Sequence, residues 1–178
     1  EEVSESDFGL MKANGYSLYF EGTISKPAGE SCRPGDSADC VTREQVAFKW
    51  GLKAGTSFDD CASATGEAGF TVPTGGTVQI KPTIHGDHWF FTNLTQGAEI
   101  TSRKAQWIAD ADIDRNGETT IDELKQVSAI DLFTPSKGYN LSGALIPIAS
   151  AYLFLEAQAR PLGDYQGDGE CPTRAVLE

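Results

Sequence analysis

The feature that most constrains this chain is a twelve-residue segment, residues 112–123, in which oxygen-bearing side chains recur at fixed intervals. They occupy its first, third, fifth, ninth and twelfth positions, as Asp112, Asp114, Asn116, Thr120 and Glu123. Gly117 stands at the sixth position, where a positive φ is open to glycine and is opposed by a Cβ. A hard cation such as Ca²⁺ requires several oxygens that converge on one point and are closed by a carboxylate. The segment therefore predicts a tight cation-binding loop.

This spacing resembles the calcium loop of the EF-hand family. The resemblance implies a Ca²⁺ site whose ligand residues are Asp112, Asp114, Asn116, Glu118, Thr120 and Glu123. In such a site Glu118 contributes its backbone carbonyl, Thr120 binds directly or through a water molecule, and Glu123 binds through both carboxylate oxygens. The alternative is an acidic helix–turn–helix linker whose charges are merely solvated.

The segment departs from the family pattern in two respects. Thr119 stands at the eighth position, where the family usually has an apolar β-branched residue that forms a short strand with a partner loop. The family normally pairs its loops, yet the nearest second candidate, residues 164–170, lacks the ligand spacing. A single loop of this kind must be supported by the rest of the domain, which favours a structural Ca²⁺ site over a calmodulin-like sensor.

Apolar residues at helical spacing flank the loop on both sides. They are Ile100, Trp107, Ile108 and Ala111 before it, and Leu124, Val127 and Ile130 after it. We therefore predict a helix, a loop and a second helix over residues 99–130. The most apolar run, residues 144–155, is too short to span a bilayer and predicts a buried helix with Ile148, Ala151, Tyr152 and Leu155 on one face.

Strands are predicted in the first half of the chain. Apolar and polar residues alternate with a period of two over residues 16–25, 46–53 and 77–84, which is typical of half-buried antiparallel strands. Residues 70–72, followed by a turn at 73–76, predict a hairpin with the third run. Strands followed by helices indicate an α+β fold. We expect an antiparallel β-sandwich or open barrel with a C-terminal, helical, EF-hand-like subdomain.

The expected organisation has three parts. Residues 1–98 form a β-rich core, residues 99–130 form the EF-hand-like helix–loop–helix, and residues 131–178 form a C-terminal helix and tail. The last part is expected to pack with the core as one domain, since 178 residues suit one well-packed domain.

Four cysteines allow three disulfide connectivities. Cys32 and Cys40 flank a polar loop and are expected to pair, which leaves Cys61 to pair with Cys171 and tie the tail to the body. The alternative is four buried thiols in a reducing compartment. An even count, loop placement and a calcium motif favour a secreted, periplasmic or cell-surface setting.

The net charge of −12 argues against nucleic-acid partners and anionic membrane surfaces, both of which attract cations. No transmembrane segment is predicted. The polar opening of the chain, residues 1–7, is typical of a mature N-terminus or of a tether to a lipid anchor. The expected partners are metal ions and a protein or glycan whose identity the sequence leaves open.

Both histidines of the chain lie in one short segment, residues 85–88, which also contains a glycine. On a regular strand residues three apart point to opposite faces, so His85 and His88 converge only if Gly86 and Asp87 form a turn. With that turn they could hold Zn²⁺ or Cu²⁺, with Asp87 or a remote carboxylate as third ligand. The alternative is a loop in which the histidines are hydrogen-bonded or exposed. The His-Gly-Asp-His string, the acidic loop and a late Gly-Glu-Cys resemble bacterial secreted proteins and lipoproteins, which bears on the compartment alone.

No catalytic residue is predicted, because the chain has no Gly-x-Ser-x-Gly elbow, reactive-cysteine context or His-Glu-x-x-His helix. The leading hypothesis is a secreted or surface-tethered metal-binding protein with a structural Ca²⁺ site and a second, transition-metal site at His85 and His88. The alternative is a calcium-stabilised β-sandwich module for adhesion or carbohydrate recognition, and exposed aromatic residues such as Tyr19 on one sheet face would favour it.

Overall fold

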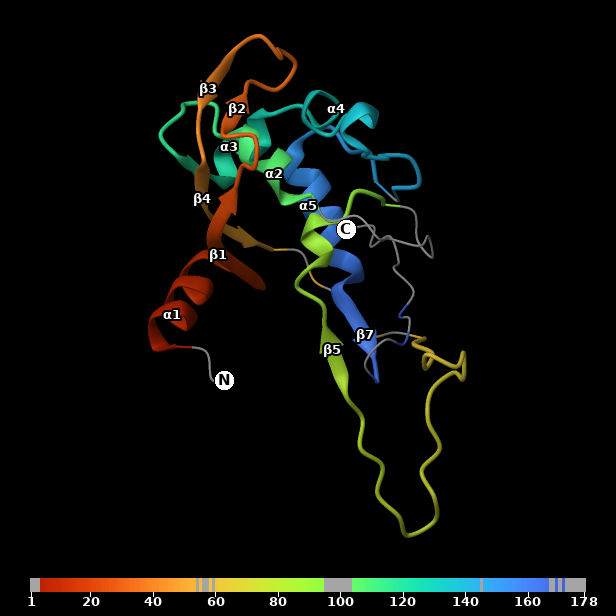
Figure 1. Cartoon of the computed structure of the whole chain (residues 1–178). Helices are drawn as coiled ribbons and strands as arrows, with labels where there is room; N and C mark the ends of the chain where they lie inside the picture. The colour runs from red at the N-terminus through yellow and green to blue at the C-terminus, as the bar shows by residue number, and fades with distance from the viewer. Residues whose placement is uncertain are drawn as a thin grey trace.

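A computed structural model describes residues 4–53, 55, 58, 60–94, 104–144, 146–166, 169 and 171. Within these ranges the fold is mixed α+β, with strands mostly in the first half and helices mostly in the second (Figure 1). This agrees with the expected fold class. Residues 95–103, which contain the predicted start of the first flanking helix, lie outside the described ranges.

The main sheet has three strands in the order β1-β4-β6. Strand β1 (Leu18–Ser25) pairs antiparallel with β4 (Gln45–Leu52), and β6 (Glu118–Thr119) pairs parallel with β4. The apolar residues of β4 at alternate positions are buried, which confirms the predicted period of two; they are Val46, Phe48, Trp50 and Leu52. The sheet therefore joins both halves of the chain.

Two further ribbons have two strands each. In one, β2 (Glu30–Cys32) pairs with β3 (Cys40–Thr42), and in the other β5 (Pro82–Ile84) pairs with β7 (Gly163–Tyr165). The described strands thus form small open sheets in place of the expected sandwich or barrel.

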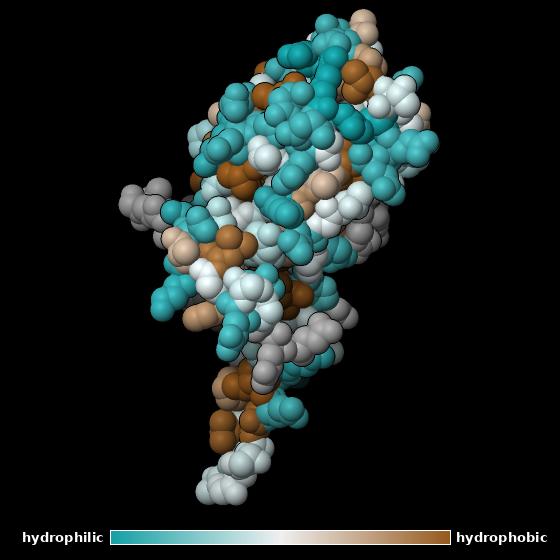
Figure 2. Space-filling view, turned by 90° about the vertical axis from the view of Figure 1, so that its left-hand side faces the viewer, coloured by the Kyte–Doolittle hydropathy of each residue, from teal (hydrophilic) through white to brown (hydrophobic). Residues whose placement is uncertain are grey.

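The predicted hairpin at residues 70–84 is wrong. The turn forms, with the Gly76 amide donating to the Pro73 carbonyl at 3.0 Å, but residues 70–81 form no strand. This segment projects from the body (Figure 1), and its hydrophobic side chains gather on the projecting part (Figure 2). Phe70, Val72 and Ile80 are exposed. An alternating pattern stabilises a strand only where one face is buried, and in the part of the chain that the structure describes these three side chains stay exposed.

The helices are short. After α1 (Glu5–Asn14) come η1 (His88–Phe90), α2 (Ala105–Ile108), η2 (Ala109–Ala111), α3 (Ile121–Gln126), α4 (Ala129–Leu132), η3 (Pro135–Lys137), α5 (Ala151–Ala159) and η4 (Arg160–Leu162). The sequence reasoning missed α1, which is capped by the Ser4 side chain and by Gly15 in the left-handed region. The helix predicted to continue to residue 130 is interrupted at Val127, whose carbonyl instead accepts from the Ala151 amide at 2.9 Å.

Helix α5 lies at the centre of the core and contacts α3, α4 and η1. It begins later than predicted, at Ala151, because the Ser150 side chain caps it by accepting from the Leu153 amide at 3.3 Å. Ile148 therefore precedes the helix. Buried side chains of α5 include Phe154 and Leu155, and they belong to the same cluster as Trp50 of β4.

Both disulfides join the cysteines that the sequence reasoning paired, Cys32 with Cys40 and Cys61 with Cys171. The first closes the β2–β3 ribbon, and the second ties the late chain to the segment after β4. Among the described helices, none is long and apolar enough to cross a membrane.

Candidate metal centres

The acidic loop directly follows η2 and its last three residues form the start of α3, and its carboxylates converge. Oxygen atoms of Asp112, Asp114 and Glu123 lie within 4.8 Å of one another. Gly117 has φ +92°, as its place at the tightest point of the loop requires, and Arg115 also lies in the left-handed region at φ +63°. The first, third and twelfth positions of the predicted loop are therefore brought together.

Asp112 has one oxygen in use and one available. Its side chain is buried, and its Oδ2 accepts from the Gly117 amide at 2.9 Å. Its Oδ1 is buried without a hydrogen-bond partner among the described residues. Burial raises the pKa of Asp112 and the charge of Glu123 raises it further, against the opposing hydrogen bond from Gly117. A buried acceptor without a donor costs free energy, which a cation among the three carboxylates would recover.

Glu123 is held at both carboxylate oxygens by hydrogen bonds within the protein. Its Oε1 accepts from the amides of Ile113 at 3.0 Å and Asp114 at 3.4 Å. Its Oε2 accepts from the Thr120 amide and the Thr120 hydroxyl, both at 2.8 Å, which completes a capping box at the start of α3. These contacts orient the residue predicted to close the loop. The Thr120 hydroxyl is engaged in the cap, so its role as a ligand stays a prediction.

Backbone turns shape the remaining ligand positions. Asp114 Oδ1 accepts from the Asn116 amide at 3.0 Å, and Asn116 Oδ1 accepts from the Glu118 amide at 2.8 Å. Aspartate and asparagine make such contacts two residues along the chain and so stabilise tight turns. Both side chains are exposed. The predicted roles of Asn116 and of the Glu118 carbonyl as ligands stay predictions.

Strand β4 holds the loop through two hydrogen bonds. The Ala47 amide donates to the Gly117 carbonyl at 2.8 Å, and Trp50 Nε1 donates to the Thr119 carbonyl at 2.9 Å. Thr119, the residue that departs from the family pattern, is fully buried in β6 beside β4. The acidic loop is therefore paired with a strand of the same chain.

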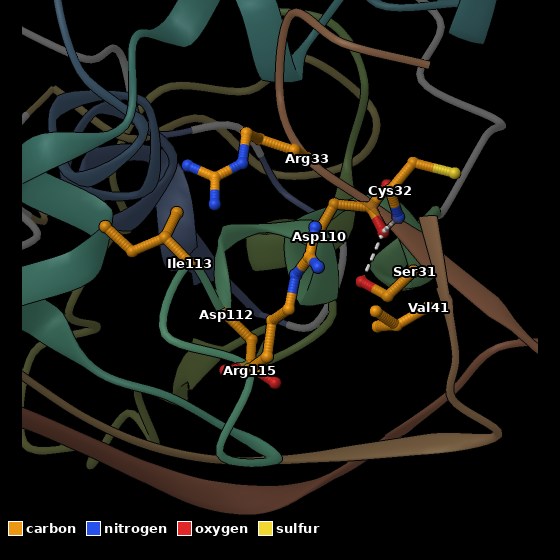
Figure 3. Close-up of a pocket in the computed structure, with 8 residues that line it drawn as sticks. All are labelled: Ser31, Cys32, Arg33, Val41, Asp110, Asp112, Ile113 and Arg115. Atoms are coloured by element: carbon orange, nitrogen blue, oxygen red, sulfur yellow. Dashed lines mark hydrogen bonds between the residues drawn. The ribbon is translucent and has the colours of Figure 1, made fainter. Parts of the chain in front are cut away.

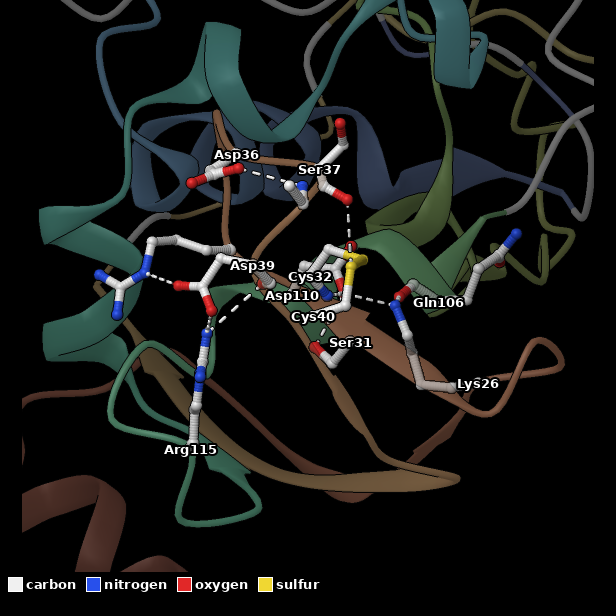
Figure 4. Close-up of a disulfide and its surroundings, with 12 residues drawn as sticks. Lys26, Ser31, Cys32, Asp36, Ser37, Asp39, Cys40, Gln106, Asp110 and Arg115 are labelled. Carbon is white, nitrogen blue, oxygen red and sulfur yellow. Dashed lines mark hydrogen bonds and ion pairs between the residues drawn. A yellow bond between two sulfur atoms is a disulfide. The ribbon is translucent and has the colours of Figure 1, made fainter.

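The β2–β3 ribbon supports the loop from a second side. The Arg115 guanidinium pairs with the Asp39 carboxylate, next to the Cys32–Cys40 disulfide (Figure 4). Arg43 Nη2 donates to the Arg115 carbonyl at 2.6 Å. Hydrogen bonds from Arg115 and Arg33 hold the pKa of Asp39 below its ordinary value. A pocket between ribbon and loop is lined by eight residues, among them Ser31, Asp112 and Arg115 (Figure 3).

The sequence reasoning missed a buried charged cluster just before the loop. Asp110 is 3% exposed, pairs with Lys26, and accepts from the Ser31 hydroxyl at 2.9 Å (Figure 4). Lys137 Nζ lies 3.8 Å from its other oxygen. The sequence does contain a signal for this cluster: Asp110 stands inside the apolar run of residues 108–111. An aspartate that is buried with such a run requires a charged or hydrogen-bonding partner.

The second cluster unites both histidines with a carboxylate from the late chain. Ligand atoms of His85, His88 and Asp164 lie within 4.8 Å of one another. The turn that the sequence required is present, with the His88 amide donating to the His85 carbonyl at 3.3 Å. Asp87, named as a candidate third ligand, is not in this group. The remote carboxylate is Asp164, which lies opposite Thr83 in the β5–β7 ribbon.

Tyr19, the example named for the module hypothesis, is partly exposed, and its hydroxyl donates to Glu21 Oε2 at 3.0 Å. One partly exposed tyrosine does not test that hypothesis, so adhesion or carbohydrate recognition stays a prediction. No family model matches the chain, and neither a curated protein nor a solved structure matches it.

Proposed function

We propose that this chain is an extracytoplasmic Ca²⁺-binding protein in which calcium, held by residues 112–123, fixes α2 and α3 against the β1-β4-β6 sheet. The observation that carries the proposal is Asp112 Oδ1, a buried acceptor without a donor that lies beside two further carboxylates. Three carboxylates in one group repel one another unless a cation neutralises them.

The donor set favours Ca²⁺ over other metal ions. All of the loop's side-chain donors are oxygens, which suit hard cations, and they include the oriented carboxylate of Glu123. Mg²⁺ demands near-ideal octahedral geometry and usually keeps several water molecules. A loop that supplies many protein oxygens, including a bidentate carboxylate, suits the larger and more flexibly coordinated ion.

A structural role suits this loop better than a sensing role. Its backbone is tied to β4 through Ala47 and Trp50, and its Arg115 is tied to Asp39. A sensor must convert between a closed and an open pair of helices when calcium binds. Here the contacts with β4 and the β2–β3 ribbon oppose such a rearrangement, so calcium is expected to stabilise one shape.

The disulfides support the proposed compartment. All four cysteines are paired. Disulfides persist mainly in oxidising compartments, where extracellular calcium modules work with dissociation constants of about 10⁻⁴–10⁻³ M. Secretion or tethering to the cell surface would therefore provide both the oxidising conditions and the calcium that the site requires.

Thermal unfolding with Ca²⁺ or with a chelator tests this function. Ligand at a hundred times its dissociation constant adds about 2.7 kcal/mol, which for a chain of this size raises the melting temperature by roughly 5–10 °C. The far-ultraviolet spectrum should change little. A melting curve that is the same with calcium and with chelator would rule out the proposal.

Matched variants identify the site. Glu123→Gln and Asp114→Asn should each remove most of the calcium-induced shift, because each removes a carboxylate from the converging group. Glu118→Gln is the control, since its side chain is not a predicted ligand and only its carbonyl is. Asp114 is exposed, so its variant folds even if loss of the Glu123 cap weakens α3. An unchanged shift in both carboxylate variants would place the ion elsewhere.

A further inference from the structure

We propose that His85, His88 and Asp164 form a second metal site, which takes a divalent transition metal, with Zn²⁺ as the ion of first choice. The inference goes beyond the calcium function and does not rest on it, because the two sites share no ligand. Nitrogen donors distinguish the sites chemically: imidazole suits Zn²⁺, Cu²⁺ and related ions, whereas Ca²⁺ prefers oxygen.

The distances fit a small metal ion. His85 Nε2 lies 3.0 Å from Asp164 Oδ2, and the ligand atoms of all three residues lie within 4.8 Å of one another. Zinc binds nitrogen and oxygen ligands at about 2.0–2.2 Å, so ligand atoms in a tetrahedral site stand roughly 3.4 Å apart. The 4.8 Å limit on the separations of the three ligand atoms exceeds that spacing by about 1.4 Å, which binding of the ion would have to close.

The hydrogen bond of His88 leaves its second ring nitrogen suited to a metal ion. Its Nδ1 lies 2.8 Å from the Pro161 carbonyl, which can only accept, so in the neutral ring Nδ1 carries the proton and Nε2 keeps its lone pair. A backbone carbonyl on the second ring nitrogen is the usual companion of a metal-binding histidine, where it fixes the tautomer and the ring direction. A His85–Asp164 ion pair alone would not require this arrangement of His88.

The three ligands are positioned by hydrogen-bonded backbone. The His85 amide donates to the Leu162 carbonyl at 2.9 Å, directly after β5. Asp164 lies in β7, the partner of β5, and His88 begins η1. The ring centroids of His85 and His88 lie 5.6 Å apart, and the two ring planes are inclined by 27°. The ring of Phe91 packs on that of His88 with 4.4 Å between centroids. Positions set by backbone pairing reduce the ordering cost of binding.

Three protein ligands leave one coordination position of a tetrahedral ion open. Structural zinc sites are usually closed by four protein ligands, whereas sites that exchange water or bind a further ligand have three. The side chain of His85 is 30% exposed and that of Asp164 is 16% exposed, so the site is accessible from solvent. The geometry therefore suits a site that holds a metal ion together with water or a small exogenous ligand.

Zinc titration of the full chain tests the site. The calcium loop is first saturated with Ca²⁺, and bound zinc is then measured by equilibrium dialysis and elemental analysis. We expect one Zn²⁺ per chain, and Co²⁺ in its place should give the visible absorption of a tetrahedral ion. Second-sphere changes typically weaken binding about 10–100-fold, so loss of a ligand in His88→Ala should weaken zinc binding at least a hundredfold.

Further variants separate the site from a folding defect and from the calcium loop. Asp164→Asn is nearly isosteric and should fold, yet it should also weaken zinc binding, whereas Asp87→Asn should not. Glu123→Gln should retain zinc while losing the calcium response, and His88→Ala should do the reverse. Zinc uptake by wild type that equals uptake by His88→Ala and Asp164→Asn would overturn the proposal, as would wild type that takes up no zinc at all.

Discussion

Asp110 is a buried charged residue close to the acidic loop. It is 3% exposed and stands two residues before Asp112, where the loop begins. Its partner Lys26 is also buried, and the Lys26 ammonium donates to the Gln106 carbonyl at 2.9 Å and lies 5.3 Å from the Trp107 ring centroid. The attraction between buried charges is offset by the cost of their desolvation, so the pair contributes little net stability. Its main effect is to hold the end of β1 against η2, and so to position the residues that lead into the loop.

Asp110→Asn should lower the free energy of unfolding by about 3 kcal/mol, because it leaves the Lys26 charge buried without its counter-ion. The value is at the lower end of the usual range because the Gln106 carbonyl still accepts from Lys26. Urea unfolding at saturating Ca²⁺ measures the change. Asp131→Asn is the matched control, since Asp131 is exposed and its variant should change stability by less than about 0.5 kcal/mol. Equal effects of the two variants would contradict this account of Asp110.

Among the elements, β4 has the widest role. It pairs with β1 along its whole length, and its buried side chains enter the core. On its other edge it pairs with β6 and so supports the acidic loop. Strand β4 thereby satisfies backbone carbonyls of Gly117 and Thr119 that would otherwise lack these donors.

Trp50→Phe tests this support, and Trp89→Phe is its control. Both indoles are buried, but Trp50 Nε1 donates to the Thr119 carbonyl, whereas Trp89 Nε1 has no acceptor among the described residues. Both variants lose similar apolar volume, and only Trp50→Phe leaves a buried carbonyl without its donor. We expect that variant to be less stable than the control by about 1–3 kcal/mol and to bind Ca²⁺ more weakly. Calorimetric titration should show the affinity of Trp89→Phe unchanged.

In the whole molecule, long-range pairings join the two halves of the chain. Strand β4 pairs with β6, β5 pairs with β7, and Cys61 is bonded to Cys171 across a separation of 110 residues. These pairings cross the expected boundary between residues 98 and 99. Each brings a late residue to an early one, and both candidate metal centres depend on such a pairing.

The two disulfides should contribute unequally to stability. A cross-link restricts the unfolded chain more when it closes a longer loop. The Cys61–Cys171 bond spans 110 residues and Cys32–Cys40 spans 8, so their removal should cost about 4–5 and about 2–3 kcal/mol respectively. Paired serine variants, Cys61→Ser with Cys171→Ser and Cys32→Ser with Cys40→Ser, avoid free thiols and are compared by urea unfolding. If the Cys32–Cys40 variant lost more free energy of unfolding than the Cys61–Cys171 variant, the contact of Asp39 with Arg115 would matter more than the entropy of the unfolded chain.

Local patterns were enough to predict several features of the molecule. The spacing of residues 112–123 predicted a loop whose carboxylates at the first, third and twelfth positions converge, because a twelve-residue loop is governed by its own glycine and turn residues. Alternation predicted β1 and β4; the apolar residues of β4 are buried, whereas in β1 Ile24 is buried and Leu18 and Phe20 are partly buried. Loop placement predicted both disulfides, since Cys32 and Cys40 close a short ribbon and only one other pairing then remained.

Other features depended on contacts between distant residues. The strand predicted at residues 77–84 survives only as Pro82–Ile84, because β7, and not residues 70–72, is its partner. Three further features arise in the same way. Asp164, and not Asp87, is the third member of the histidine cluster, β4 pairs with β6 beside the acidic loop, and Lys26 is the counter-ion of Asp110. Spacing along a chain specifies which chemical groups a short loop presents, whereas the packing of segments far apart in sequence specifies which groups complete a site.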